Sequence, residues 1–227
     1  MPAATRFVTL SFDDGFRTSS VRTAELYERF GLRAEFHVVA TYGLRDPVTF
    51  GDWALWNDLA ARGHVIHPHG YDHTNKTSLP TERAQDSILQ CLEEFQAHLH
   101  GFDPAQAIFA FPYNASTPEL EAWLPTVVRA FRTGHTALNP LPSAGTVRLT
   151  TGGWEDAEPW LDRCTEDLLA LNEGWLIYCA HGLDGEGWGP LRHDYLERLL
   201  ERLVATENLE ILPARDILRR FDAAPEA

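Results

Sequence analysis

Cysteine is scarce in this sequence of 227 residues, and no uninterrupted apolar run approaches the length of a membrane-spanning helix. The three cysteines, Cys91, Cys164 and Cys179, are an odd number at wide spacings, which fits neither a disulfide framework nor a cysteine-based zinc site. Residues 1–6 lack the basic segment and the apolar stretch of about 7–15 residues that form a secretory leader. These absences predict a cytoplasmic protein with reduced thiols and no membrane association.

Basic residues are also few, because 19 lysines and arginines face 33 aspartates and glutamates, which gives a net charge of −14. Binding to nucleic acid or to an anionic membrane depends on clustered basic side chains, so we expect neither partner. A hydrophobic content of 44% is ordinary for a globular protein. We expect residues 1–227 to form a single domain, and the sequence indicates no oligomeric state.

Apolar runs with strand character alternate with amphipathic segments through most of the chain. We expect strands at residues 7–12, 34–40, 64–67, 108–111, 175–180 and 209–212, and helices at 19–30, 52–62, 82–100, 117–129, 159–172 and 193–206, with 213–221 closing the chain. Residues 134–153 are rich in turn-forming residues, and a short strand at 146–149 is the only element predicted there. About seven strands with intervening helices predict an α/β fold of the distorted (β/α)7 barrel type.

A pair of aspartates followed by glycine ends the first apolar run, in Ser11-Phe12-Asp13-Asp14-Gly15. Two adjacent carboxylates repel each other in a confined site, so a cation or a shared proton is needed to hold both there. A solvated turn is the alternative, because Asp and Gly are common turn residues. If the pair is functional, we expect one carboxylate to bind a metal ion and the other to take a proton.

Two histidines four residues apart, His69 and His73, follow the strand expected at 64–67. Their imidazoles can converge on one ion, although chance pairing is the alternative in a chain with ten histidines, and His67 is a nearby competitor. Two imidazoles and one aspartate suit zinc or another divalent transition ion. Such an ion lowers the pKa of a water molecule, and the second carboxylate can take its proton as the water attacks a carbonyl carbon.

A third histidine, His181, ends the apolar run at 175–180 and precedes a glycine-rich, acidic loop. The chemistry needs a proton donor for the leaving group, and an imidazole titrates near working pH. A capped strand end is the alternative. We therefore predict His181 as a general acid, at the C-terminal strand ends where Asp13, Asp14, His69, His73 and Tyr113 are also expected.

Three stretches resemble the polysaccharide deacetylases of the NodB-homology group, carbohydrate esterase family four. Residues 10–15 resemble the first motif of that family, residues 34–39 resemble the strand written A-T-F-F-V, and residues 63–73 are similar to G-H-E-I-G-N-H-T-x-x-H without a gap. The resemblance implies a distorted (β/α) barrel and removal of an acetyl group. It also implies roles for six residues: Asp13 as catalytic base, Asp14, His69 and His73 as metal ligands, His181 as general acid of an L-x-L-x-H motif, and Tyr113 as backbone donor to the oxyanion.

The sequence departs from the family pattern at three places. Ala110 stands where the family has an arginine that orients the base, and Gly70 replaces a hydroxyl residue. The acid pair and tryptophan of the fourth motif have only a loose counterpart in Trp154-Glu155-Asp156. Trp154 and Trp188 are candidates for stacking on a sugar ring, with core or rim packing as the alternative.

Three functions follow from these residues. The first is a metal-dependent hydrolase, with zinc as the expected metal, that removes an acyl group from an N- or O-acylated carbohydrate-like substrate, either a small molecule or an oligosaccharide. The second is a hydrolase of a small amide, ureide or cyclic imide on the same fold. The third is a non-catalytic binding module that retains the metal site but has lost turnover with the arginine.

Overall fold

The first strand of the protein, β1 (Arg6–Asp14), lies at the centre of a largely parallel sheet. The computed structural model describes residues 5–152 and 157–223. The sheet has the order β3-β2-β1-β8-β6, and β9 also pairs with the beginning of β1. Its other strands are β2 (Glu35–Val38), β3 (Val65–Pro68), β8 (Gly174–Ala180), the antiparallel β6 (Leu138–Asn139) and β9 (Leu209–Ile211).

A second, parallel sheet contains β4 (Ile108–Ala110), β5 (Ala130–Gly134) and β7 (Arg148–Thr151) in that order. The two sheets approach each other at β7 and β8 and at β3 and β4. A bridge joins Gly152, just after β7, to Tyr178 in β8, and the Ile108 N–H donates to Nδ1 of His67 in β3 at 3.3 Å. No ladder pairs β3 with β4 in residues 5–152 and 157–223, so the barrel-type α/β arrangement consists of two sheets.

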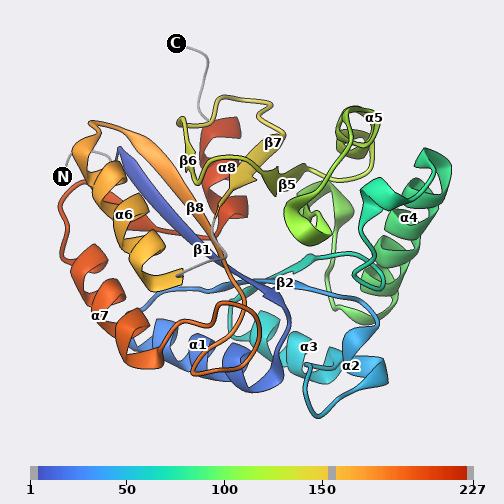
Figure 1. Ribbon diagram of the computed structural model, residues 1–227, viewed down its shortest axis with the longest axis horizontal. Helices are drawn as coiled ribbons and strands as arrows, with labels where there is room; N and C mark the ends of the chain where they lie inside the picture. The colour runs from blue at the N-terminus through green and yellow to red at the C-terminus, as the bar shows by residue number, and fades with distance from the viewer. Residues whose placement is uncertain (1–4, 153–156, 224–227) are drawn as a thin grey trace.

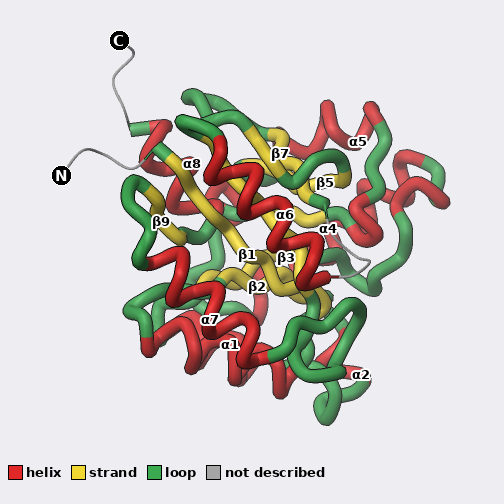
Figure 2. The backbone as a smooth tube through the Cα atoms, turned by 60° about the vertical axis from the view of Figure 1, so that its left-hand side comes forward, coloured by secondary structure: helices red, strands yellow, loops and turns green. Residues whose placement is uncertain are grey.

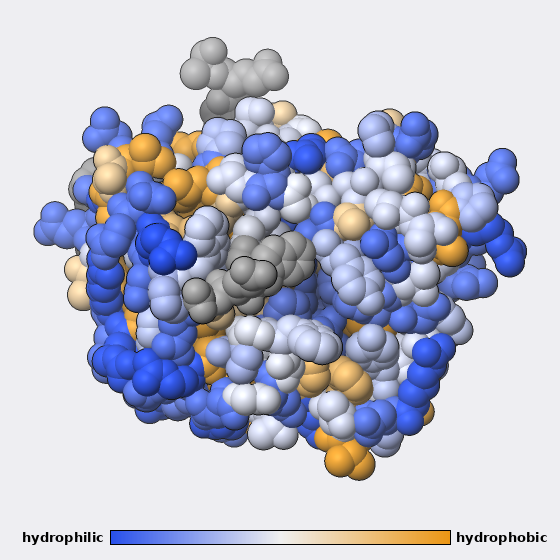
Figure 3. All heavy atoms as spheres, in the orientation of Figure 1, coloured by the Kyte–Doolittle hydropathy of each residue, from blue (hydrophilic) through white to orange (hydrophobic). Residues whose placement is uncertain are grey.

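Helices surround these strands (Figure 1). Figure 1 shows α6, α7 and α1 to the left of and below β1, and Figure 2 shows α7 and α1 next to each other. The helices are α1 (Arg17–Arg29), α2 (Tyr42–Arg45), α3 (Trp53–Ala61), α4 (Thr81–His98), α5 (Pro118–Trp123), α6 (Ala157–Ala170), α7 (His193–Val204) and α8 (Ala214–Asp222). None of the described helices is long and apolar enough to cross a membrane. Hydrophilic residues cover most of the face in Figure 3, where apolar residues surface in separate patches.

Successive residues of a strand point to opposite faces of the sheet. One face of the β1 sheet therefore packs against the helices, and the other face lines the interior between the two sheets. On β1, Val8, Leu10 and Phe12 belong to the larger apolar cluster, which also contains helix residues. Thr9, Ser11 and Asp13 have the other parity and are buried polar residues. The interior is therefore polar toward the C-terminal ends of the strands. A smaller apolar cluster of Phe7, Trp175, Ile177 and their neighbours packs against α8.

The segment after residue 117 differs from the sequence prediction. The helix expected over 117–129 ends at Trp123, a 3-10 turn follows at Leu124–Thr126, and the unpredicted strand β5 begins at Ala130. Pro125 explains the early end, because a proline lacks the N–H that a helix interior requires. The short strand expected at 146–149 is observed at Arg148–Thr151. The other predicted elements are present with ends shifted by a few residues.

Candidate functional site

Asp14, His69 and His73 lie together at the C-terminal ends of β1 and β3. Each offers one ligand atom, and the three atoms lie within 4.8 Å of one another. Nε2 of His73 is 3.2 Å and Nε2 of His69 is 3.6 Å from Oδ1 of Asp14. The pair of histidines and the carboxylate expected from the sequence is thus brought into one cluster.

The backbone is strained at this cluster. Asp14 and His73 have φ angles of 70° and 62°, and Tyr113, beside them, has 60°. Few non-glycine residues adopt this left-handed region, and such strain is concentrated at functional sites. At Asp14 the strain has a direct consequence: adjacent strand residues point to opposite faces, yet Asp13 and Asp14 both line the same cavity.

His69 is held in the orientation that a metal ligand needs. Its Nδ1 is 3.0 Å from the backbone oxygen of Ala110, which can only accept, so Nδ1 carries the proton and Nε2 presents a lone pair. Burial lowers the pKa of His69 to about 4, which keeps the imidazole neutral. A neutral imidazole with a free Nε2 is the form that coordinates a cation.

These residues fit a divalent cation. Oδ1 of Asp14 is buried and has no hydrogen-bond partner among the described residues, although two imidazoles are close to it. Burial raises the pKa of Asp14, but the imidazoles of His73 and His69 lower it by more, so the carboxylate is ionised. An ionised, unpartnered oxygen beside two imidazole nitrogens is the two-nitrogen, one-oxygen set that suits zinc and similar ions.

The second carboxylate, Asp13, is held by Arg132 on β5. One guanidinium nitrogen of Arg132 lies 3.0 Å from Oδ1 of Asp13 and the other contacts Oδ2, in a buried bidentate pair. The Ser11 hydroxyl donates to Oδ1 of Asp13 at 2.8 Å and also contacts Arg132. Burial raises the pKa of Asp13, but the charge and hydrogen bonds of Arg132, together with smaller effects of the nearby imidazoles, lower it by more, and the pKa lies well below its usual value.

Arg132 was not among the site residues predicted from the sequence. In the parallel register of β4 and β5, Arg132 is the direct partner of Ala110, the position at which the family pattern has an arginine. The guanidinium therefore comes from β5, the strand next to β4, at the residue directly opposite Ala110. The signal in the sequence was a single basic residue inside the short apolar run Ala130-Phe131-Arg132-Thr133-Gly134, between the expected helix and the turn-rich segment.

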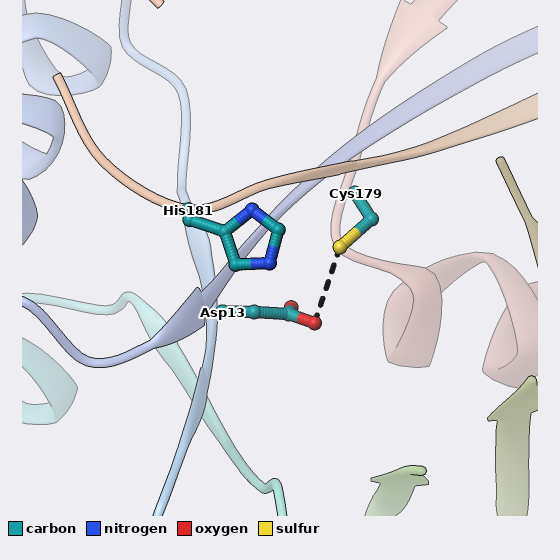
Figure 4. A group of neighbouring side chains, drawn as sticks. All are labelled: Asp13, Cys179 and His181. Carbon is teal, nitrogen blue, oxygen red and sulfur yellow. Dashed lines mark hydrogen bonds between the residues drawn. The ribbon is translucent and has the colours of Figure 1, made fainter. Parts of the chain in front are cut away.

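Cys179 and His181 face Asp13 from the end of β8 (Figure 4). The Cys179 thiol donates to Oδ2 of Asp13 at 3.2 Å, and burial raises the pKa of the thiol well above its usual value. One ligand atom from each of Asp13, Cys179 and His181 also lies within 4.8 Å of the others. A cation is less suited to this group than to Asp14, His69 and His73, because the Arg132 guanidinium already neutralises Asp13.

One cavity of about 580 Å³ is lined by all six residues to which the family resemblance assigns a role, namely Asp13, Asp14, His69, His73, Tyr113 and His181. Trp188 is 75% exposed at this cavity, and Tyr113 is 55% exposed, with its ring 4.7 Å from that of His73 between centroids. Three aromatic side chains that the sequence analysis did not single out also line it, namely Phe16, Tyr42 and Phe50. Trp154, the other predicted substrate residue, lies outside the described residues.

Residues 2–124 match the model of the polysaccharide deacetylase family. No curated protein matches the sequence. Among solved structures, a Mycobacterium smegmatis protein assigned as a polysaccharide deacetylase is similar with a TM-score of 0.75 and 14% identity, over 98% of this chain and 92% of that one. Puue allantoinase has a TM-score of 0.72 and 15% identity, over 99% and 93%.

A family 4 acetyl xylan esterase from Clostridium thermocellum, in complex with a cobalt ion, has a TM-score of 0.66 and 19% identity, over 94% of this chain and 91% of that one. At these identities the similarity of the solved structures shows the fold. The matched residues 2–124 include Asp13, Asp14, His69, His73 and Tyr113, whereas Arg132, Cys179 and His181 lie beyond them.

Proposed function

The chain belongs to the polysaccharide deacetylase family, and on that premise we propose that it is a metal-dependent hydrolase that removes an acetyl group from an N- or O-acylated carbohydrate. One observation carries the proposal: Asp14, His69 and His73 converge beside a carboxylate, Asp13, that an arginine holds in the same cavity. Metal ligands and a separately held base are the two parts that hydrolysis of an amide or ester by activated water requires.

Asp14, His69 and His73 would hold the metal ion, with zinc as the expected occupant. When bound, a divalent cation supplies a Lewis acid and lowers the pKa of water. The unpartnered Oδ1 of Asp14 and the free Nε2 of His69 support this assignment. The backbone carbonyl of Ala110 fixes the His69 ring, so Ala110 contributes to the site through its main chain.

Asp13 acts as the base, taking a proton from the attacking water. Arg132, Ser11 and Cys179 direct hydrogen bonds at its two oxygens, which fixes the carboxylate in one orientation. The same contacts keep it ionised, since hydrogen bonds to the charged form favour that form. A fixed, ionised carboxylate is ready to accept a proton without rearrangement.

His181 acts as the general acid, protonating the nitrogen or oxygen of the departing sugar. Its ring lies close to the Asp13 carboxylate just after the end of β8 (Figure 4), and it lines the cavity. The backbone N–H of Tyr113 stabilises the oxyanion, as preorganised backbone donors do in acyl transfer. Trp188, exposed at the cavity, offers a flat face to a sugar ring.

Acetate release from N-acetylglucosamine oligomers and from acetylated xylan tests the proposal. We expect wild-type protein to release acetate, Asp13→Asn to lose most of the activity and Asp14→Ala to lose both activity and bound metal. Asp58→Asn is the matched control, because Asp58 lies on the exposed face of α3 and pairs with Arg62. Wild-type protein that binds no divalent metal would refute the proposal.

A second candidate function is hydrolysis of a small cyclic amide or imide. Two observations favour it: the similarity to Puue allantoinase over nearly the whole chain, and the aromatic walls formed by Phe16, Tyr42 and Phe50. Cleavage of small cyclic amides without acetate release from oligosaccharides would select it over the first.

The third candidate, a binding module without turnover, depended on the missing arginine at position 110. Arg132 supplies a guanidinium to Asp13, so that motive for the hypothesis is weaker. A large fall in any hydrolytic rate on Asp13→Asn would eliminate the binding module.

A further inference from the structure

A groove of about 500 Å³ opens at the N-terminal ends of β2, β3 and β4, the end of the barrel opposite the candidate active site. Three arginines line it: Arg33 precedes β2, and Arg215 and Arg219 lie on α8. Among the described residues that line the groove, Asp103 is the one carboxylate. Such a concentration of positive charge is unexpected in a chain of net charge −14.

Most neighbouring carboxylates are already engaged. Asp216 pairs with Arg33 at 2.7 Å, and Asp103 accepts from the Ala105 N–H at 2.9 Å. Glu35, buried beneath, accepts from the Ala214 N–H at 2.6 Å and contacts His37 at 2.9 Å. Arg33 and backbone N–H groups thus hold these carboxylates at short range, and Asp216 and Glu35 attract Arg215 only from longer distances.

Arg215 and Arg219 keep free donors. Nε of Arg215 is buried without a hydrogen-bond partner among the described residues, and its nearest carboxylate oxygen, on Asp216, is 3.6 Å away. Nε of Arg219 donates to the neutral Gln106 at 2.8 Å. Two like charges four residues apart on a helix repel each other, so an anion between them would relieve that repulsion.

A buried imidazole adds a further donor. His67 is 2% exposed, lines the groove and accepts the Ile108 N–H at Nδ1, so its neutral ring carries the proton on Nε2. That Nε2 has no hydrogen-bond partner among the described residues. Burial lowers the pKa of His67 to about 3, with Arg215 and Arg219 adding to the effect, so the ring stays neutral. An unpaired buried donor is costly and points to an absent acceptor.

We propose that this groove binds a small phosphate-bearing anion between Arg215, Arg219 and the imidazole of His67. The ligand must be an acceptor, because every free group named above is a donor. Guanidinium forks match the geometry of phosphate oxygens, and the volume exceeds that of one phosphate group, which leaves room for an attached organic moiety. The site is separate from the cavity at Asp13 and does not depend on the proposed hydrolysis.

Calorimetric titration and thermal unfolding of the full chain with inorganic phosphate and pyrophosphate test the proposal, with potassium chloride at matched ionic strength as the salt control. We expect saturable binding and a rise in Tm for wild-type protein. The exposed substitution Arg219→Gln should weaken binding at least tenfold, and Arg215→Gln/Arg219→Gln should abolish it. Arg202→Gln, which removes an exposed arginine of α7 paired with Glu166, should bind as wild type does.

Citrate separates phosphate recognition from general attraction to carboxylates, and we expect it to bind more weakly than pyrophosphate. A chelator-treated sample removes any binding of phosphate to a metal in the other cavity, and binding to the groove should persist there. The proposal is overturned if wild-type protein shows only the effect of potassium chloride, or if the double variant binds phosphate as tightly as wild type.

Discussion

Arg132 and Asp13 form a buried bidentate ion pair although they come from strands of different sheets. Arg132 on β5 pairs with Ala110 on β4, the position at which the family pattern has an arginine. The guanidinium therefore reaches the site from the strand next to the one that carries it in the family pattern. The Asp13 carboxylate is thereby oriented by a residue at a different point in the sequence. The geometry at Asp13, rather than the identity of residue 110, decides whether the base is supported.

Removal of Arg132 should abolish the proposed hydrolysis, and an arginine at position 110 should restore it. Arg132→Ala leaves Asp13 as an unpaired buried carboxylate, which costs about 3–5 kcal/mol of stability. It should also lower kcat/KM by at least about a hundredfold, the usual contribution of a positioned base. In Ala110→Arg/Arg132→Ala the guanidinium returns from the neighbouring strand, and we expect both stability and kcat/KM to recover in part.

The measurements are kcat/KM for acetate release and Tm for each variant. Arg148→Ala is the control, because Arg148 on β7 is half exposed and pairs with Glu121 away from the cavity. A folded double variant with no more activity than Arg132→Ala would contradict the positioning role.

The two halves of the candidate metal site, Asp13-Asp14 and His69 with His73, could be predicted from the sequence because each half is local, whereas their convergence depends on the order of β1, β2 and β3 in the sheet. Asp13 and Asp14 are adjacent, and His69 and His73 are four residues apart, so local structure alone brings each pair together. Strand β1 and the long helix α4 were likewise predictable from periodicity. These patterns need no knowledge of how the sheets are arranged.

Arg132 could not be predicted in the same way. Its contact with Asp13 depends on the β4–β5 register and on the way the two sheets face each other, and these are set by packing between distant segments. The helix expected over 117–129 leaves no connection before β5, whereas the break at Pro125 ends the helix early enough for a separate strand to begin at Ala130. Phe16, Tyr42 and Phe50 were missed for a related reason, since contacts between the segments that follow β1 and β2 bring them to the cavity.

Removal of the metal ligands should abolish metal binding and the stabilisation that it gives. A ligand that binds the folded state raises Tm, so a chelator should lower the Tm of wild-type protein. Asp14→Ala and His73→Ala should contain little metal by elemental analysis, and the chelator should leave their Tm unchanged. His98→Ala removes an exposed imidazole that contacts Glu94, and this control should behave as wild type does. Equal metal content in all four proteins would place the ion elsewhere.

Substitution of Trp188 should affect substrate binding more than stability. The side chain is 75% exposed at the cavity, so Trp188→Ala should change the free energy of unfolding by no more than about 0.5 kcal/mol. Loss of a stacking face should raise KM severalfold for an oligosaccharide with little change in kcat, because the ring touches no reacting atom. Trp160→Ala, at a 40% exposed tryptophan that Arg163 covers, is the control. An unchanged KM would exclude Trp188 from the substrate site.

Stability should fall as the pH is lowered from about 6.5, because buried histidines must remain neutral in the folded protein. Burial lowers the pKa of both His37 and His67 from 6.5 to about 3. Between these values the unfolded chain binds protons that the folded chain does not, so acid favours unfolding. The contribution of each histidine is complete above pH 6.5 and declines by about 1.4 kcal/mol per pH unit as the pH falls toward 3.

Denaturant unfolding at several pH values between 7 and 5, on protein from which a chelator has removed metal, measures how the free energy of unfolding changes with pH. His37→Gln, which keeps a donor for Glu35, should reduce the slope by about 1.4 kcal/mol per pH unit. His135→Gln removes an exposed imidazole and should leave the slope as in wild type. Asp13 contributes with the same sign, but only below its ordinary pKa of 3.8, outside the measured range. Burial raises the pKa of Glu35 above its ordinary value of 4.5, so Glu35 contributes with the opposite sign, and the comparison with His37→Gln isolates the histidine. If the slopes of His37→Gln and wild type are equal, His37 is protonated in the folded protein, and its ring forms a charged pair with Glu35 rather than a neutral hydrogen bond.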